Sequence, residues 1–188
     1  MWVAVKRDKS SHDSQYDASS FPTDVHSRVS QSRRVAVEAL PNIGREAHTY
    51  LHHIVSRYAD LADLTIFVQG DPYDHIIRSL HTTPFEKMFD PAVGGALSPK
   101  MSILNESTPP SHSLSRLDIH GASTKVIGKQ LDVYRFSPGA QYAVPRAAIH
   151  HKGLAWWQDV LKMVVDDEVN AWEIERLWMY MFGFISVV

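Results

Sequence analysis

Apolar residues recur at every third or fourth position along residues 44–58, which predicts an amphipathic helix with one buried face. The apolar positions are Ala47, Tyr50, Leu51, Ile54 and Tyr58. Asparagine favours the position just before a helix, so we expect Asn42 to cap this one.

Two stretches on either side of this helix have the composition of β-strands. Residues 34–40 alternate valine with polar neighbours and end at Pro41 and Asn42. Residues 64–68 form a run of β-branched and aromatic residues, which is typical of a buried strand. Strand, helix and strand in this order favour a right-handed parallel crossover, and therefore a parallel sheet.

The middle of the chain changes character after residue 70. Asp71 and Pro72 have the order of a helix cap and a first helical residue, so a helix is expected over residues 71–81. Residues 82–130 are rich in proline, glycine and serine, and only residues 100–104 have a strand-like pattern. A connection of this length inside one domain is typical of a functional or disordered insertion.

The last third of the chain predicts two short strands followed by helices. Residues 131–137 and 142–144 have strand patterns, and the chain becomes helical from Arg146. Gly153 separates this start from an amphipathic helix over residues 154–165, and a further helix is expected from Ala171 to Phe182.

These elements predict an α/β protein organised as one domain. We expect residues 34–188 to form a small, mostly parallel central sheet with helices on both faces and a long irregular insertion. Residues 1–33 contain many serine, aspartate, histidine and glutamine residues and are expected to be a flexible N-terminal segment.

The composition excludes several classes of partner and chemistry. The chain has 19 Lys+Arg against 21 Asp+Glu, so it lacks the positive field that binds nucleic acid. It has no cysteine, which removes disulfides, thiolate nucleophiles and cysteine-bound zinc. Charges near the N-terminus and the lack of an apolar run of about 20 residues predict a cytoplasmic protein with no membrane partner.

The start of the first helix is unusually rich in ionisable groups. Two adjacent stripes carry Arg45, His48 and His52 on one side and Glu46, Tyr50 and His53 on the other. One interpretation makes Glu46 and His48 a general base and acid, with Arg45 binding an anionic group. The alternative is an ordinary solvent-facing helix surface. His48 and His52 have a spacing that suits a metal, yet no third ligand is nearby, so no metal is predicted.

Polar residues follow the strand at residues 64–68, where ligand crevices of open α/β sheets lie. They are Gln69, Asp71, Asp74 and His75. Asp71, Asp74 and His75 could ligate a divalent ion or position a substrate hydroxyl. The alternative is that the two aspartates cap the next helix and offset its dipole.

A third group of candidates lies toward the C-terminus. Gln141 and Arg146 follow a turn, and Glu173 and Glu175 point about 200° apart on a helix, so one of them at most faces a given cleft. The alternative for Glu175 is a buried pair with an arginine. The four tryptophans between residues 156 and 178 could line an apolar pocket or belong to the core. No Walker loop, serine elbow or dinucleotide fingerprint is present.

Four segments together resemble a known family. They are Asn-Ile-Gly-Arg-Glu-Ala-His-Thr-Tyr-Leu at residues 42–51, Phe-Val-Gln-Gly-Asp-Pro at 67–72, Gly-Ala-Gln-Tyr at 139–142 and Glu-Arg-Leu-Trp at 175–178. The family is common in fungi, is described only as a domain of unknown function, and is itself similar to the acceptor half of GT-A type glycosyltransferases. This resemblance implies a GT-A-like fold, substrate contacts at Gln141 and Arg146, and Glu173 or Glu175 as a candidate base.

We expect a cofactor-independent enzyme of specialised metabolism that cyclises or isomerises a largely apolar small molecule in a preorganised pocket. The expected catalytic residues are Glu46, His48, Asp71 and His75. The expected substrate-binding residues are Arg45, Tyr50, Gln69, Gln141, Arg146 and Glu175. One alternative is a GT-A-like glycosyl or other group transferase that uses Mn²⁺ or Mg²⁺ with a nucleotide sugar, and another is a non-catalytic binding module. A homodimer is the one protein partner that we consider.

Overall fold

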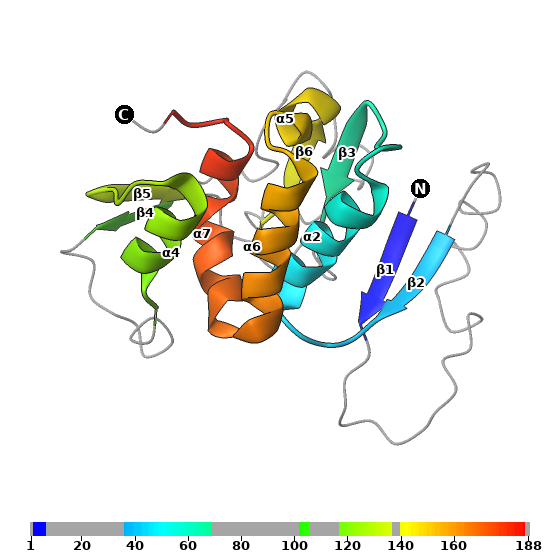
Figure 1. Cartoon of the computed structure of the whole chain (residues 1–188), viewed down its shortest axis with the longest axis horizontal. Coiled ribbons are helices and arrows are strands. Elements are labelled where there is room, and N and C mark those ends of the chain that lie inside the picture. Colours follow the sequence, from blue (N-terminus) through cyan, green and yellow to red (C-terminus); the bar gives the residue numbers. More distant parts are fainter. Residues whose placement is uncertain (1, 7–35, 69–101, 106–116, 137–139, 187–188) are drawn as a thin grey trace, which may run out of the picture. The chain divides into compact units, whose positions relative to one another are not determined.

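The computed structural model describes residues 2–6, 36–68, 102–105, 117–136 and 140–186 of the chain. They belong to two compact units, Met1–Ile43 and Gly44–Val188 (Figure 1). In the first unit, β1 (Trp2–Lys6) runs parallel to β2 (Ala36–Leu40), with Trp2 opposite Ala36. Strand β1 therefore belongs to the predicted N-terminal segment, most of which lies outside the described residues.

The described part of the second unit mixes helices with two strand pairs. The helices are α2 (Arg45–Arg57), α4 (Ile119–Ile127), α5 (Arg146–His150), α6 (Leu154–Asp166) and α7 (Val169–Met181). The strand pairs are β3 (Leu64–Phe67) with β6 (Tyr142–Pro145) and β4 (Ser102–Asn105) with β5 (Val133–Phe136). The prediction of a mixed α/β protein is confirmed, and the predicted helix at residues 71–81 lies outside the described residues.

The strands in the described ranges do not form the mostly parallel, GT-A-like sheet that the sequence suggested. Strand β3 pairs antiparallel with β6, so that Phe67 lies opposite Tyr142, while β2 pairs with β1. The pattern of residues along the chain predicts which segments form strands, but long-range packing decides which strands pair with each other. Strand β3 is also less buried than predicted, because Leu64 and Ile66 are 45% and 41% exposed.

Helix α2 begins after a glycine instead of the predicted asparagine cap. Gly44 has a φ of 57° and no side chain caps the helix. A Cβ atom at Gly44 would lie 2.2 Å from Val164 Cγ1 on α6. The absence of a side chain at Gly44 therefore lets the start of α2 approach the end of α6.

Helix α4 lies within the long stretch that the sequence predicted to be irregular. The Asp118 side chain accepts a hydrogen bond of 2.8 Å from the Gly121 N–H and caps the helix. Gly128, with a φ of 76°, ends it. An aspartate, apolar residues at helical spacing and a closing glycine are all present in the sequence, but proline-rich and serine-rich neighbours obscure them.

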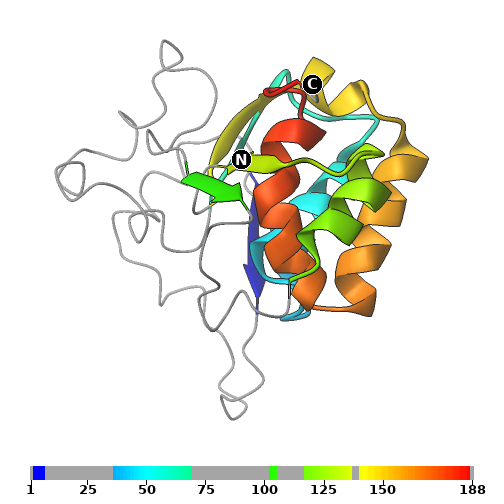
Figure 2. The same ribbon diagram turned by 90° about the vertical axis from the view of Figure 1, so that its left-hand side faces the viewer.

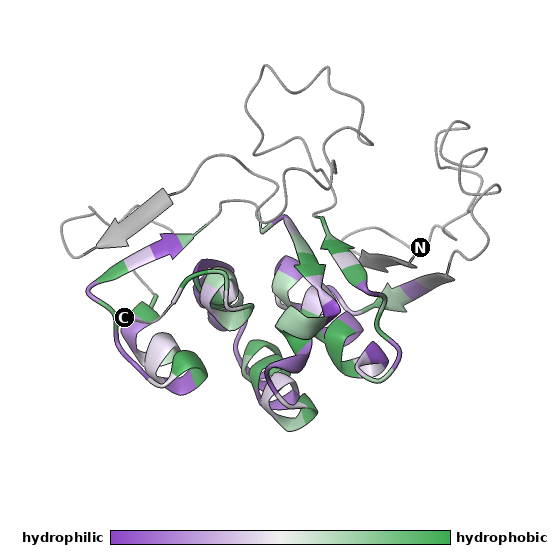
Figure 3. Ribbon diagram, turned by 90° about the horizontal axis from the view of Figure 1, so that it is seen from above, coloured by the Kyte–Doolittle hydropathy of each residue, from purple (hydrophilic) through white to green (hydrophobic). Residues whose placement is uncertain are grey.

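Helix α7 is the central element of the second unit. It contacts α2, α4, α6 and β5, and Figure 1 shows it between the α4/β5 side and the α2/α6 side, while Figure 2 shows α7 running beside α4. Figure 3 shows that the surrounding helices carry both hydrophobic and hydrophilic residues, as expected of amphipathic helices. Most positions of α7 are buried: Ala171, Glu173, Ile174, Arg176, Leu177, Trp178, Met179, Tyr180 and Met181. No helix in the described ranges is long and apolar enough to cross a membrane.

Phe182, directly after α7, joins the other elements through its ring. The ring centroid lies 5.1 Å from that of Trp178, 5.9 Å from Trp157 on α6, 5.8 Å from Tyr142 on β6 and 6.1 Å from Phe67 on β3. Aromatic pairs at such separations contribute about 0.5–1.5 kcal/mol each beyond the area that they bury. This cluster holds the β3–β6 pair against α6 and α7.

Replacing Gly44 tests the close approach of α2 to α6. Gly44→Ala should lower the free energy of unfolding by more than Gly128→Ala, measured by urea unfolding. Both residues have positive φ, but a Cβ at Gly128 meets no atom within 4 Å, so its cost is backbone strain of about 1–2 kcal/mol alone. Equal losses in the two variants would contradict the close approach.

Candidate functional site

A buried phenol marks the centre of the candidate site. Tyr50 on α2 is only 4% exposed, and its hydroxyl has no hydrogen-bond partner in the part of the chain that the structure describes. Its ring packs against Phe67, 4.8 Å away, and Trp178, 5.9 Å away, between ring centroids. A buried polar atom without a partner costs about 1–3 kcal/mol, so its presence in the core needs an explanation.

Two carboxylates act on this phenol from different helices. Burial raises the pKa of Tyr50 well above its usual value, and Glu46, Tyr142 and Glu175 raise it further by their charges. Glu46 lies one turn before Tyr50 on α2, and Glu175 lies one turn before Trp178 on α7. We call Glu46, Tyr50, Tyr142 and Glu175 the Tyr50 site. Its phenol stays neutral at physiological pH and keeps its proton as a hydrogen-bond donor.

Each carboxylate of the Tyr50 site has an arginine beside it. Arg45 Nε lies 3.6 Å from Glu46 Oε2, and Arg176 Nη1 lies 3.5 Å from Glu175 Oε2. Trp172 connects the two pairs, because the Arg45 guanidinium lies 4.2 Å from its ring centroid and Arg176 Nη1 donates to its carbonyl. The four charged groups therefore form a cluster without net charge that extends from α2 to α7.

Arg176 is the buried member of this cluster. Desolvation lowers the pKa of its guanidinium, whereas Glu175 and Glu173 oppose that change. Its Cζ also lies 5.2 Å from the centroid of the Phe136 ring on β5. Arg176 thus fixes the part of α7 that carries Glu175 against both the helix backbone and a strand.

Strained backbone adjoins the site on two segments. Arg45 and Ala140, each with a φ of 49°, are the residues other than glycine that have positive φ in the described ranges. Arg45 directly precedes Glu46, and Ala140 precedes Gln141 and Tyr142. A left-handed conformation costs a non-glycine residue about 1–2 kcal/mol, and such strain concentrates at functional sites.

The structure gathers part of the predicted site. Arg45, Glu46, Tyr50 and Glu175 share the charged cluster or the phenol, and buried Gln141 immediately precedes Tyr142. Tyr142 was predicted only as a strand residue. Its inward direction follows from the alternation of strand β6, in which Tyr142 and Val144 are buried. Gln69, Asp71 and His75 lie outside the described residues.

His48 lies on another face of α2. A Cβ at Gly44 would lie 3.0 Å from the His48 Cβ and 2.2 Å from Val164, so this face of the helix is turned toward α6. Residues two apart on a helix point about 200° apart, which separates His48 from both Glu46 and Tyr50. The described geometry therefore does not pair Glu46 and His48 as a base and acid at one point.

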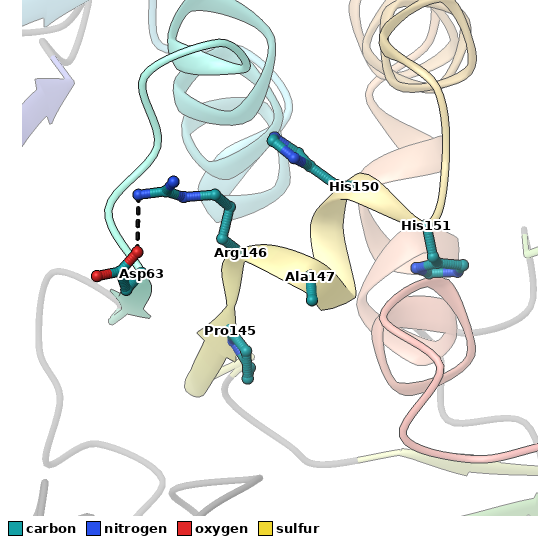
Figure 4. A pocket seen from close by; sticks show the side chains of 6 residues that line it. All are labelled: Asp63, Pro145, Arg146, Ala147, His150 and His151. Atoms are coloured by element: carbon teal, nitrogen blue, oxygen red, sulfur yellow. Dashed lines mark ion pairs between the residues drawn. The ribbon is translucent and has the colours of Figure 1, made fainter.

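Arg146 belongs to a shallow surface hollow instead of the Tyr50 site (Figure 4). Its guanidinium pairs with Asp63 at 2.9 Å, and its N–H donates to the Asp63 carbonyl at 2.9 Å. The hollow is lined by Asp63, Pro145, Arg146, Ala147, His150 and His151. His150 Nε2 donates to the Tyr58 carbonyl at 2.8 Å and His151 Nδ1 to the Ala148 carbonyl, so both rings make structural bonds.

The described ranges contain no group of three or more histidine, aspartate or glutamate side chains that could hold a metal ion. The His48 and His52 rings are 6.1 Å apart between centroids.

Glu173 has a structural role on the opposite side of α7. Its Oε1 accepts a hydrogen bond of 2.7 Å from the Asp118 N–H, just before α4. Burial raises the pKa of Glu173, and the bond from the Asp118 backbone opposes this. The predicted divergence of Glu173 and Glu175 explains the result, since one binds α4 and the other acts on Tyr50.

The charge on buried Glu173 should make stability depend on pH. A raised folded-state pKa means that the carboxyl contributes stability below about pH 4, and that this contribution is lost as pH rises through the folded pKa. Glu173→Gln keeps an acceptor for the Asp118 N–H and removes the ionisation. The unfolding free energy of the wild type should therefore fall relative to Glu173→Gln as pH rises from 4 to 7 (~3 pH units). A pH-independent difference would contradict the burial of this charge.

One comparison with known proteins gives a match. Residues 2–88 match the model of a family described as a protein of unknown function (DUF3431). This segment covers less than half of the chain and includes Arg45, Glu46 and Tyr50, but it excludes Tyr142 and Glu175. Neither a curated protein nor a solved structure matches the chain. The resemblance to a domain of unknown function is confirmed for residues 2–88.

Proposed function

We propose that the protein is an enzyme that cyclises or isomerises a small organic molecule at the Tyr50 site, through a transition state that gains positive charge. The observation that carries this proposal is the buried Tyr50 hydroxyl, which has no hydrogen-bond partner in the described residues and whose pKa is raised by burial first and then by the charges of Glu46 and Glu175. These carboxylates come from helices far apart in the sequence. A solvent-facing helix surface would not need a second acid from α7.

The electrostatics of the site favour a cation. Burial raises the pKa of Tyr50 most, and the charges of Glu46 and Glu175 raise it further, so negative charge at the phenol oxygen is unfavourable. In this proposal the two carboxylates, although each is paired with an arginine, lie closer than the arginines to the positive charge that develops on a bound substrate and stabilise it. Aromatic faces attract cations as well, and Tyr50 packs beside Phe67 and Trp178. Groups that favour the transition state over the neutral substrate raise the rate of the chemical step.

The residues of the site have different roles in the proposed proton transfer. One of Glu46 and Glu175, in its protonated form, gives a proton to the substrate so that positive charge develops, and the other, as a carboxylate, removes a proton from the resulting cation, a contribution of about 10²–10⁴-fold to the rate. Tyr50 orients the reacting group by donating its hydroxyl proton. Arg45 and Arg176 hold the two carboxylates in position through the contacts of 3.6 and 3.5 Å. Proton transfer of this kind needs no cofactor.

The position of Glu175 in the site also supports an alternative function, that of a group transferase. Glycosyl transfer also passes through a transition state of oxocarbenium character, which these carboxylates would stabilise. Glu175 would then be the base that activates an acceptor, and Mn²⁺ or Mg²⁺ would accompany a nucleotide sugar. The two proposals differ in the product, because isomerisation and most cyclisations keep the mass of the substrate and transfer increases it.

Turnover of small molecules tests the proposal. Purified protein is incubated with a metabolite extract of its source organism, with and without nucleotide sugars and Mn²⁺, and products are followed by mass spectrometry. Glu175→Gln and Glu46→Gln should each lower the turnover by about 100-fold or more. A product of unchanged mass supports isomerisation or cyclisation, and a heavier product supports transfer.

Glu168→Gln is the matched control, because Glu168 is exposed at the start of the same helix. It should keep the turnover of the wild type. Thermal unfolding of all variants separates lost chemistry from lost folding. Equal activity of Glu175→Gln, Glu46→Gln and the wild type would contradict an enzymatic role and favour a non-catalytic binding module.

A further inference from the structure

We infer that Trp172 is a positioning residue of the Tyr50 site and acts through Arg45. Its indole ring holds the Arg45 guanidinium in the place where that group lies beside the Glu46 carboxylate. This inference rests on the proposed function, in which Glu46 takes part in proton transfer. It assigns a role to a tryptophan that the sequence left open between an apolar pocket and the core.

Trp172 differs from the other tryptophans near it in the sequence. Trp157 and Trp178 belong to the hydrophobic core, and the partly buried Trp156 packs against it. Trp172 is also partly buried, but it is not among the described residues that pack against this core. Its ring lies instead against Arg45, whose Cζ is 4.2 Å from the ring centroid. The aromatic face of Trp172 therefore serves a cation, as is common for tryptophan and arginine.

The place of Trp172 on α7 brings it to the charged cluster. Glu175 and Arg176 follow it three and four positions later, so the three side chains are neighbours on the helix surface. The Trp172 carbonyl also accepts a hydrogen bond from Arg176 Nη1, which lies 3.5 Å from Glu175 Oε2. One residue of α7 thus contacts both arginines that accompany the carboxylates of the site.

The backbone at Arg45 supports a role for this contact. Arg45 has a φ of 49°, a left-handed conformation that suits glycine and strains a residue with a Cβ atom. Such strain persists only where the surroundings hold the residue in place. The contacts with the Trp172 ring and with Glu46 Oε2, at 3.6 Å from Arg45 Nε, both belong to the guanidinium. They explain why an arginine occupies a position that favours glycine.

A double-mutant cycle, measured by urea unfolding of the full chain, tests whether Trp172 holds Arg45. Arg45→Gln removes the cation and keeps the Cβ atom with its strain, and Trp172→Leu removes the aromatic face. The two changes should be coupled by about 2–5-fold in the unfolding equilibrium constant, the range of an exposed cation–π contact. The matched control is Trp156→Leu, because the Trp156 ring contacts Lys152 at 5.2 Å instead. It should show no coupling with Arg45→Gln.

Hydrogen exchange and turnover connect this contact to the site. The Arg45 Nε–H, followed by NMR, should exchange with water more slowly in the wild type than in Trp172→Leu. Trp172→Leu should lower the turnover by up to about 100-fold, the cost of a small displacement at a reacting centre. Trp172→Phe keeps an aromatic face and should restore most of the turnover. Trp156→Leu should keep both the exchange rate and the turnover of the wild type.

Two results would overturn the inference without any measurement of turnover. They are the absence of coupling between Arg45→Gln and Trp172→Leu, and equal exchange of the Arg45 Nε–H in Trp172→Leu and the wild type. Full turnover in Trp172→Leu, together with lost turnover in Glu46→Gln, would also overturn it. By contrast, full turnover in Glu46→Gln with the coupling intact would reject the catalytic role of Glu46, and Trp172 would remain the residue that holds Arg45.

Discussion

Packing of aromatic rings around Phe182 is the interaction on which the rest of the second unit depends. Phe182 ends the most buried helix, and its ring contacts residues of α6, α7, β3 and β6. These contacts fix the rotation of α7 about its axis. The rotation in turn decides that Glu175 acts on Tyr50 of α2 and that Glu173 binds the backbone before α4. A core interaction therefore positions the candidate chemistry.

Helix α7 carries three charged residues in a setting where burial of charge is costly. Glu173 meets a backbone N–H, and Arg176 meets the Trp172 carbonyl and Glu175. Their neighbours thus offset much of the cost of burial. The Tyr50 hydroxyl has no hydrogen-bond partner among the described residues, and the same holds for Thr65 Oγ1 and Arg176 Nε. The unpartnered, buried phenol is the reason that the proposed function places the substrate at Tyr50.

The sequence predicted elements where the signal was local. The spacing of Ala47, Leu51 and Ile54 was enough to place α2, and the same argument placed α6 and α7. Helix α4 was missed because its cap and apolar stripe are short and lie among turn-forming residues. Strand pairing was wrong because the pairing of β3 with β6 depends on contacts between distant parts of the chain, which a pattern of residues does not encode.

The residues of the candidate site were likewise predictable from the sequence only where the signal was local. The local density of ionisable groups identified Arg45, Glu46 and Tyr50, and the 200° divergence separated Glu173 from Glu175. The same angle separates Glu46 from His48, which the sequence interpretation had combined as a base and acid. The meeting of Glu175 and Tyr142 with Tyr50 required the tertiary structure, since these residues come from three different elements.

The central claim is that Glu46 and Glu175 converge on a neutral, buried Tyr50 hydroxyl. An NMR titration of the Tyr50 ¹³Cζ resonance tests it most directly, in the wild type and in a Glu46→Gln/Glu175→Gln double variant. The wild-type phenol should remain protonated at about pH 10, where a free tyrosine is half ionised. The double variant should ionise at lower pH than the wild type, because two charges that raise the pKa of Tyr50 are removed. Ionisation at the ordinary pKa, with identical curves in both proteins, would contradict the claim.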